Sequence, residues 1–349
     1  DEIQIQAYPL GHDGQNDTDV LACTAASAAL CLTDAPFQGP VATVRVGRIV
    51  TDDGEQLVLN PTTAQLEFSD LDMVVSGHAD GINMIEVGAA EVGDADVLAA
   101  IKFAYDNGIK PILEMQLELA QKFGAPAKRM GDASGLPSED VVNKVKSLVE
   151  EKLTEYRQIK SKAERGNAID ALRDQLIKEH FAIPEGIPYS EHMKAEKRQA
   201  EAKEAFRRLE KKICHGLVAK YGVRADGRGL NEIRPLLMEV GIYPRMHGSS
   251  LFQRGETQSI CSTTLGTSRN EQIVDGLLPE FSKKFYLHYN FPPFCTGEAG
   301  RISGPGRREI GHGALAERSL LGILPDVGEF PYTIRVVSDI TESNGSSSM

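Results

Sequence analysis

Arginine and histidine side chains near the C-terminus have types and spacing suited to binding phosphate. Arg307 and Arg308 begin a predicted helix in the run Arg-Arg-Glu-Ile-Gly-His-Gly, and His312 follows one turn later. A helix start offers unpaired N–H groups and a positive dipole end, and arginine adds forked donors, so the combination suits an anion. The structural alternative is that Arg308 pairs with Glu309 or Glu317 and that His312 is a packed helix residue.

A serine-rich turn follows the last β-rich run. Ser346, Ser347 and Ser348 stand directly after Asn344-Gly345. Hydroxyl groups and successive backbone N–H groups in a turn form an anion-binding concavity, although an ordinary polar turn is the alternative. We predict that these serines form one phosphate pocket with the arginines of the helix.

The two ends of the chain look like parts of one module that occurs twice. A predicted strand at Ile3–Ala7 leads to a turn with Asn16, as a predicted strand at Thr333–Val337 leads to Asn344. An alanine-rich helix follows the first turn, whereas the chain stops at Met349 after the second. We therefore expect a window cut from a longer polypeptide, with a coincidental similarity as the alternative.

The two copies differ in charge at this turn. When the asparagines are aligned, Asp17 stands opposite Gly345 and Asp19 opposite Ser347. Two carboxylates repel phosphate, so the first copy is predicted to be inactive even if its fold is intact.

Three other segments hold residues that could contact RNA. Arg254, in the run 252–258, is predicted to lie in a turn before a strand, where it could contact an RNA backbone; a solvated arginine is the alternative. The aromatic residues of 288–294 could stack on bases, but core and loop packing is favoured. For 224–228, a salt-bridged turn is favoured over contact with substrate.

The elements that must position these residues fall into three blocks: an α/β block, a helical block and a second α/β block. A segment rich in Gly, Pro and Ala (124–137) separates the first two, and helical periodicity continues to residue 220. The predicted elements are helices at Val20–Leu32, near Asp94–Phe123, from Ser138, at Glu191–Lys220 and at Gly311–Leu324; a hairpin turn at Asp52–Gly54; and β runs at Ala42–Val50, Leu57–Asn60, Leu71–Ser76, Gln258–Leu265, Lys284–Tyr289 and Tyr332–Val337.

Composition is ordinary for a globular protein, with 41% hydrophobic and 25% charged residues and no apolar run of membrane-spanning length. The five cysteines have no metal-like spacing and are interpreted as free thiols of a reducing cytosol. The net charge of −12 is uneven. Residues 1–138 carry 21 acidic against 7 basic residues, whereas residues 221–349 carry 14 against 13, and 11 of these 13 are arginines. A local anion site is therefore compatible with an acidic whole.

Five motifs in order resemble those of the bacterial polynucleotide phosphorylase family. They are Arg-Ala-Asp-Gly-Arg (224–228), Phe-Gln-Arg-Gly-Glu-Thr-Gln (252–258), His-Tyr-Asn-Phe-Pro-Pro (288–293), Arg-Arg-Glu-Ile-Gly-His-Gly (307–313) and Ile-Thr-Glu-Ser-Asn-Gly-Ser-Ser-Ser-Met (340–349). The first block adds matches at 16–17, 25–29, 36–40 and 59–62. The resemblance covers nearly the whole chain, and five ordered motifs are far more specific than any single one.

The resemblance implies an α/β (α+β) fold with two partial RNase PH-like modules, of the ribosomal protein S5 domain 2-like type, joined by an all-helical domain. Residues 1–125 would form the C-terminal part of the first module, 126–220 the helical linker domain, and 221–349 the truncated N-terminal part of the second, catalytic module. It also implies a cytoplasmic, ring-shaped homotrimer around a channel for single-stranded RNA, with other RNA-degradation proteins as further partners.

The implied activity is phosphorolytic 3′→5′ exoribonuclease activity in mRNA turnover. Inorganic phosphate is the co-substrate, nucleoside diphosphates are released, and the reverse reaction polymerises RNA without a template. By motif, the resemblance makes Arg308 and His312 catalytic, assigns phosphate binding to Arg307, Arg308 and Ser346–Ser348, and places Arg254 on the path of the RNA.

The resemblance also implies parts that this sequence does not contain. In this family the Mg²⁺-binding aspartates and a nearby lysine follow the serine turn, so their equivalents are expected downstream of Met349, with KH and S1 domains later still. The chain is therefore expected to hold no metal ligands and to be inactive alone. The alternative function is a non-catalytic RNase PH-like RNA-binding scaffold of a degradation complex; a hydrolytic nuclease is disfavoured because no carboxylates cluster near the Arg/Ser pocket.

Overall fold

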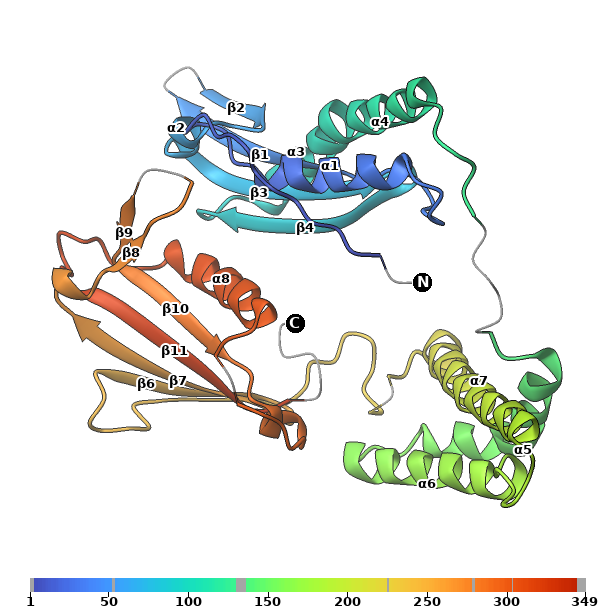
Figure 1. Ribbon diagram of the computed structural model, residues 1–349. Helices are drawn as coiled ribbons and strands as arrows, with labels where there is room; N and C mark the ends of the chain where they lie inside the picture. Colours follow the sequence, from blue (N-terminus) through green and yellow to red (C-terminus); the bar gives the residue numbers. More distant parts are fainter. Residues whose placement is uncertain are drawn as a thin grey trace. The chain divides into compact units, whose positions relative to one another are not determined.

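The computed structural model describes residues 3–51, 54–129, 136–224, 226–277, 280–302 and 304–343 (Figure 1). The chain divides into two compact units. One unit comprises Asp1–Met130 with Pro235–Met349, and the other is Gly131–Arg234. Within the described ranges, no helix is both long enough and apolar enough to cross a bilayer.

The first α/β block is a four-stranded antiparallel sheet in the order β2-β1-β3-β4. Apolar residues on one face of its central strands are fully buried, and they pair across the ladder, as Val44 does with Val75 and Val46 with Met73. Residues of the following helices complete this core. The bounds of the elements are α1 (Asp19–Cys31), β1 (Ala42–Thr51), β2 (Gly54–Leu59), α2 (Thr63–Leu66), β3 (Ser69–His78) and β4 (Gly81–Ala89).

A long helical stretch then packs on this sheet as α3 (Asp94–Ala104), the π-helical turn η1 (Tyr105–Ile109) and α4 (Lys110–Phe123). The wide turn directly precedes Pro111, which has no N–H to donate and whose ring clashes with the carbonyl four residues earlier. At Gly108 an added Cβ would lie 3.0 Å from Cγ1 of Val44, so glycine permits the close approach of helix and sheet.

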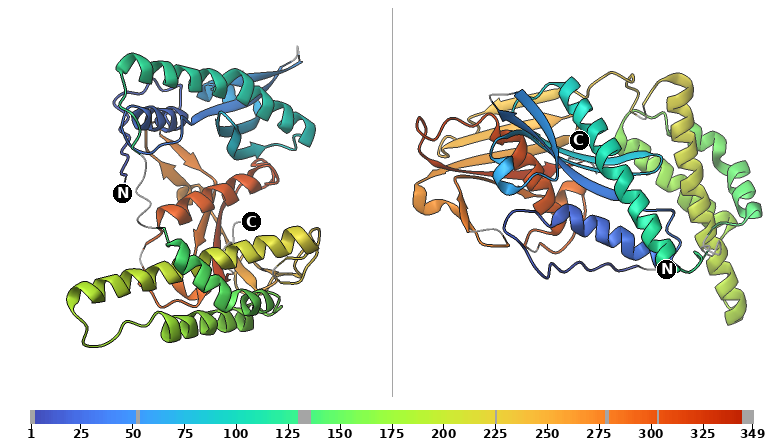
Figure 2. Two further views of the ribbon diagram at one scale, coloured as in Figure 1. Left: turned by 90° about the vertical axis from the view of Figure 1, so that its right-hand side faces the viewer. Right: turned by 90° about the horizontal axis from the view of Figure 1, so that it is seen from above.

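The described residues of the second unit form three helices, α5 (Glu139–Tyr156), α6 (Lys162–His180) and α7 (Tyr189–Tyr221), and each contacts the other two (Figure 2). Ser138 is the N-cap of α5, as predicted, and its hydroxyl donates to Glu201 at 2.7 Å. Apolar residues that recur at helical spacing fill the core. Buried are Val141, Val145, Val149, Leu153, Ile169, Leu172 and Leu176, whereas Leu148 and Ile177, which share the predicted helical periodicity, are exposed and partly buried, respectively.

The second α/β block has a five-stranded sheet in the order β10-β11-β7-β6-β5, in which β10 and β11 are parallel and the other neighbours antiparallel. Helix α8 (Arg307–Leu321) connects the parallel pair and packs on β10 (Figure 1). The strands are β5 (Leu236–Val240), β6 (Gly248–Arg254), β7 (Thr257–Gly266), β10 (Phe285–Asn290) and β11 (Thr333–Glu342), with a separate hairpin of β8 (Gln272–Val274) and β9 (Phe281–Lys283) and two 3₁₀ turns, η3 (Ser268–Asn270) and η4 (Pro293–Thr296).

Most predicted elements are present, with two kinds of difference. The strand predicted at Ile3–Ala7 is wrong: this segment has no regular structure, and Ile3 and Ile5 are exposed, because no described strand pairs with it. The predicted repeat of a strand near each end of the chain is therefore seen only at the second position, where Thr333–Val337 is part of β11. Strands β4, β5 and β6 were not predicted, since their residues do not alternate cleanly between apolar and polar. The short strands β8 and β9 were not predicted either.

Candidate phosphate-binding site

The start of α8 is stabilised by hydrogen bonds to Glu309, a side chain of its first turn. Gly306 is the N-cap, and Arg307 and Arg308 are the first two helical residues. The Glu309 carboxylate accepts the N–H of Gly306 at 2.7 Å and, with its other oxygen, the N–H of Phe291 at 2.7 Å. This glutamate therefore satisfies one unpaired donor of the helix start and fixes that start to the end of β10.

The second acidic residue of α8 is also engaged elsewhere. Glu317 accepts the Leu287 N–H at 3.0 Å and forms an ion pair with Lys283 at 2.8 Å. The structural alternative for Arg308, an ion pair with Glu309 or Glu317, is therefore wrong. Both Arg307 and Arg308 are exposed, and neither side chain has a hydrogen-bond or ion-pair partner among the residues that the structure describes.

His312 lies one turn into α8, against the sheet. Its ring stacks on that of Tyr289, with centroids 4.0 Å apart and an interplanar angle of 3°. Burial lowers the pKa of His312, and the positive charge of Arg308 lowers it further. The imidazole is therefore neutral at pH 7, and a neutral ring has one nitrogen that can accept a hydrogen bond.

The strands β10 and β11 end close to one another, at the end of the sheet where α8 begins. β10 and β11 run in parallel, and the Asn290 amide donates to Asp339 at 2.7 Å close to both strand ends. Ser343, the last described residue, donates its N–H to Cys295 just after β10. The chain therefore leaves β11 at the end of β10 where α8 begins. Ser346, Ser347 and Ser348 themselves lie outside the described residues.

Arg254 is the last residue of β6, beside the Gly255 turn that leads into β7. It is half-buried, and its side chain has no hydrogen-bond or ion-pair partner within the described part of the chain. In the sheet order, β6 is three strands from β10, so Arg254 lies roughly 14 Å across the sheet from the strand that carries α8. Arg254 therefore does not lie next to the first turn of α8.

The other two segments have the favoured roles with one exception. In 224–228, Arg228 and Asp226 form an ion pair at 2.7 Å, so the turn is salt-bridged. In 288–294, Tyr289 belongs to the core of the block, and its ring stacks on Phe291 with centroids 6.4 Å apart. Phe294 is 58% exposed and is not part of this core.

In the first block, the aspartates predicted to repel phosphate surround an arginine that sequence reasoning missed. Arg45 on β1 forms ion pairs with Asp19 at 2.7 Å and with Asp17 and Asp72 at 3.5 Å. Its side chain is only 13% exposed. An internal guanidinium is therefore already paired with the carboxylates at this position.

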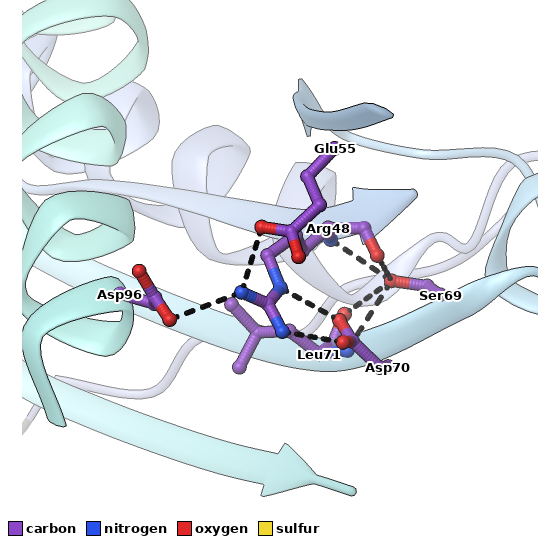
Figure 3. A network of polar contacts seen from close by, with 6 residues as sticks. All are labelled: Arg48, Glu55, Ser69, Asp70, Leu71 and Asp96. Carbon is purple, nitrogen blue, oxygen red and sulfur yellow. Dashed lines mark hydrogen bonds and ion pairs between the residues drawn. The ribbon is translucent and has the colours of Figure 1, made fainter. Parts of the chain in front are cut away.

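A second arginine of β1, also missed, has the same kind of surroundings (Figure 3). Arg48 forms ion pairs with Asp70 at 2.5 Å, Glu55 at 3.0 Å and Asp96 at 3.1 Å, and thus joins β1, β2, β3 and α3. The hydrogen bonds to Asp70 raise the pKa of Arg48 above its usual value. Arginines on a strand of an acid-rich segment were the available signal for both networks.

A cleft of about 570 Å³ is lined by residues of α8, β10 and β11. Its charged side chains have partners: Lys283 pairs with Glu317, Arg335 contacts His288, and Glu309 accepts two backbone N–H groups. Burial and Arg335 both lower the pKa of His288. Arg308 and His312 do not line this cleft, so it is separate from the predicted phosphate site.

The described residues do not supply a metal site. No group of three or more His, Cys, Asp or Glu residues among them could hold an ion. At this end of the sheet the two oxygens of Glu309 each accept a backbone N–H, and Asp339 accepts the Asn290 amide. These residues do not fit a magnesium ion.

The fold and the arginine-bearing helix fit a class of RNA-degrading enzymes that three family models define. The model "3′ exoribonuclease family, domain 1" matches residues 232–349, "Polyribonucleotide nucleotidyltransferase, RNA binding domain" matches 140–229, and "3′ exoribonuclease family, domain 2" matches 39–107. The chain thus has RNase PH-like domains on both sides of a helical region, as predicted.

Curated relatives narrow this class to one family. Polyribonucleotide nucleotidyltransferases are 44% identical over 348 residues in Phenylobacterium zucineum, 46% over 351 residues in Sorangium cellulosum and 43% over 348 residues in Thermus thermophilus. The chain belongs to the polyribonucleotide nucleotidyltransferase family. Each alignment covers 100% of the chain but only 44% to 47% of the relative, so the chain spans less than half the length of these proteins.

Proposed function

We propose that the protein is a phosphorolytic 3′→5′ exoribonuclease that acts in mRNA turnover. An oxygen of inorganic phosphate attacks the phosphorus of the 3′-terminal phosphodiester of single-stranded RNA. The new O–P bond forms as the bond from phosphorus to the 3′ oxygen of the preceding nucleotide breaks. One nucleoside diphosphate leaves, the shortened RNA keeps a 3′ hydroxyl, and the reverse reaction adds nucleotides without a template.

One observation carries this proposal: the two arginines at the start of α8 have no described partner, although two glutamates are on the same helix. Phosphate supplies the nucleophile, so the protein needs to position and neutralise charge rather than to activate a side chain. Unpaired, exposed guanidinium groups at a helix start are suited to this task.

The predicted site residues divide this work. Arg307 and Arg308 hold phosphate, together with Ser346, Ser347 and Ser348 from the turn that follows β11. His312 is neutral and can accept a hydrogen bond from a P–OH group, which a protonated ring could not do. The charge of Arg308 also lowers the pKa of His312, so these two side chains are electrostatically coupled in the proposed site.

RNA contacts would extend beyond this site. Arg254 at the end of β6 is proposed to contact the RNA backbone. The helical unit matches a model whose name includes RNA binding, and it has a groove lined by five basic residues. Lys203 in this groove has no ion-pair partner among the described residues, whereas Arg173 is paired with Asp170 and Asp174. This groove supports RNA binding by the helical unit.

The wider features are also proposals. We propose the module boundaries 1–125, 126–220 and 221–349, a homotrimer, a cytoplasmic location and association with other RNA-degradation proteins. Magnesium remains an expectation from the family resemblance, and because the described residues do not fit the ion, no step above depends on it.

The test is an assay of the longest natural form of the protein on 3′-labelled single-stranded RNA, with and without phosphate. Release of nucleoside diphosphates only with phosphate is expected. Release of nucleoside monophosphates without phosphate would identify a hydrolytic nuclease. RNA binding without any release would identify the alternative function, a non-catalytic RNase PH-like scaffold.

A further inference from the structure

Strand β10 is at the edge of its sheet, so one side of its backbone has no neighbouring strand. Successive N–H groups of a strand alternate in direction, and those of Leu287, Tyr289 and Phe291 therefore point to the same side. An edge of this kind is a site for unwanted pairing unless it is covered. Here the two outer N–H groups donate to Glu317 and Glu309 of α8, at 3.0 Å and 2.7 Å.

The spacing of the two glutamates matches the spacing of the two N–H groups. Eight residues of α-helix rise about 12 Å, and four residues of strand extend about 13 Å. Helix and strand run in opposite directions, so Glu309 meets the later N–H and Glu317 the earlier one. One helix can therefore satisfy both donors without bending.

Gly313 lies midway between the two glutamates and faces the midpoint of the strand. It is buried, and an added Cβ would lie 3.4 Å from Cβ of Tyr289 and 3.5 Å from its backbone nitrogen. The missing side chain lets α8 approach β10 closely enough for both carboxylates to reach the strand. Glu309, Gly313 and Glu317, at every fourth position, form what we call the edge clamp.

The edge clamp also acts at the predicted phosphate site. Glu309 accepts the Gly306 N–H, and the N–H groups of Arg307 and Arg308, as the first of the helix, have no acceptor among the described residues. It fixes the first turn to Phe291, at the end of the sheet where β11 ends. The same contacts engage both carboxylates of the helix that could otherwise bind the cations of the site.

We propose that Glu309 and Glu317 are positioning residues of the phosphate site: by holding α8 on the edge of β10 they place Arg308 and His312 for phosphate. This inference rests on the proposed function. Neither glutamate touches phosphate or the reacting atoms, so the effect passes through the position of the helix.

The first experiment measures the clamp without reference to activity. Amide hydrogen exchange of Leu287 and Phe291 is followed in the wild-type protein and in Glu317→Ala and Glu309→Ala. Both amides are expected to be protected in the wild type. Glu317→Ala should speed exchange mainly at Leu287, and Glu309→Ala mainly at Phe291. Rapid exchange of both amides in the wild type would overturn the clamp.

The second experiment measures phosphorolysis by the longest natural form and separates KM for phosphate from KM for RNA. Glu309→Ala is expected to raise KM for phosphate by roughly tenfold to hundredfold, the scale of a small misplacement of binding groups, with little change in KM for RNA. Glu309→Gln should have an intermediate effect, because its one amide oxygen can accept either the Phe291 N–H or the Gly306 N–H, while its NH2 group meets the other donor. The control is Glu329→Ala, an exposed glutamate without a described side-chain partner, which should change neither constant.

The decisive comparison repeats Glu309→Ala in an Arg308→Met background. If Glu309 acts by positioning Arg308, its removal should raise KM for phosphate far less there than in the wild type. An equal factor in both backgrounds would overturn the positioning role, as would an unchanged KM in Glu309→Ala. If the wild type released no nucleoside diphosphates in the presence of phosphate, the proposed function and the positioning role would both be overturned. Amide exchange would still decide whether the edge clamp exists.

Discussion

The two α/β blocks use arginine in opposite ways. In the first block, Arg45 and Arg48 each have three carboxylate partners and side chains that are 13% and 12% exposed. In the second block, Arg307 and Arg308 are exposed and have no partner within the described residues, although Glu309 is next to them in the sequence. A largely buried guanidinium that is surrounded by three carboxylates is shielded from phosphate, whereas an exposed and unpaired one is open to it.

This difference also explains the uneven charge of the chain. Residues 1–138 carry 21 acidic residues against 7 basic ones. Six of those acidic residues surround only two arginines, so part of the acidity has an internal, structural role. In the second block the glutamates of α8 are bound to backbone N–H groups and Lys283, and the arginines remain available. Net charge alone therefore gives no guide to where an anion binds.

The comparison predicts its largest effect on activity. Arg308→Met should reduce the rate of phosphate-dependent RNA shortening by about 10²- to 10³-fold, the scale for removing one donor to a developing negative charge. Arg45→Met, the matched change in the first block, should leave the rate per folded molecule close to that of the wild type. The measurement is release of nucleoside diphosphates by the longest natural form. Equal losses in both variants would contradict the assignment of phosphate binding to the second block.

For the free energy of unfolding, the order of the two substitutions should be reversed: Arg45→Met should have the larger effect and Arg308→Met the smaller one. Arg45→Met leaves Asp17, Asp19 and Asp72 without their shared cation, and we expect it to lower the free energy of unfolding by roughly 2 kcal/mol, the scale of lost hydrogen bonds to charged groups. Arg308→Met breaks no described contact and should change stability by less than about 0.5 kcal/mol. Urea unfolding of both variants measures this. A larger loss in Arg308→Met would show that this arginine has a structural partner.

The local electrostatics of the second block predict a pH effect. Burial and Arg308 lower the pKa of His312, so between that pKa and the usual value of 6.5 the unfolded chain binds more protons than the folded one. His312 therefore contributes to a loss of stability as pH falls through this window. Arg308→Met should raise the pKa of His312, because a repulsive positive charge is removed. In the wild type, bound phosphate should also raise the pKa of His312, because its negative charge favours the protonated ring.

NMR titration of the His312 ring measures both shifts. Arg307→Met is the control, because burial and Arg308 are the two causes of the low pKa and Arg307 is not among them. An unchanged pKa in Arg308→Met would show that burial alone lowers it. An unchanged pKa on phosphate binding would place the anion away from this ring.

The sequence predicted the helices with regular apolar spacing well, but it predicted the strands only in part. The buried stripe of α5 could be identified because its apolar residues recur every three to four positions. Strands such as β5 were missed because all five of its residues are exposed in the described chain and show no alternation. The strand at Ile3–Ala7 was wrong because a strand depends on a partner that local sequence does not specify.

For the candidate site, the residue types could be predicted but not their partners. The run from Arg307 to His312 indicated an anion site, yet sequence spacing alone left Arg308 a choice between Glu309 and phosphate. The choice depends on the strand edge of β10, which binds Glu309 and Glu317 through backbone N–H groups far away in the sequence. The networks of Arg45 and Arg48 were missed for the same reason, because their partners come from other strands and helices.

The smallest predicted effects concern helical glycines in the two blocks. At Gly108 a Cβ would lie 3.0 Å from Val44 and 3.1 Å from Leu59, so Gly108→Ala should lower the free energy of unfolding by about 1 kcal/mol after the gain in helix propensity is offset. Gly311 of α8 is exposed and a Cβ there would meet nothing within 4 Å, so Gly311→Ala should raise stability by about 0.5–1 kcal/mol. Urea unfolding of the two variants measures both signs. A loss of stability in Gly311→Ala would reveal a close neighbour at the start of α8, and this face of the helix would then not be open to phosphate and RNA.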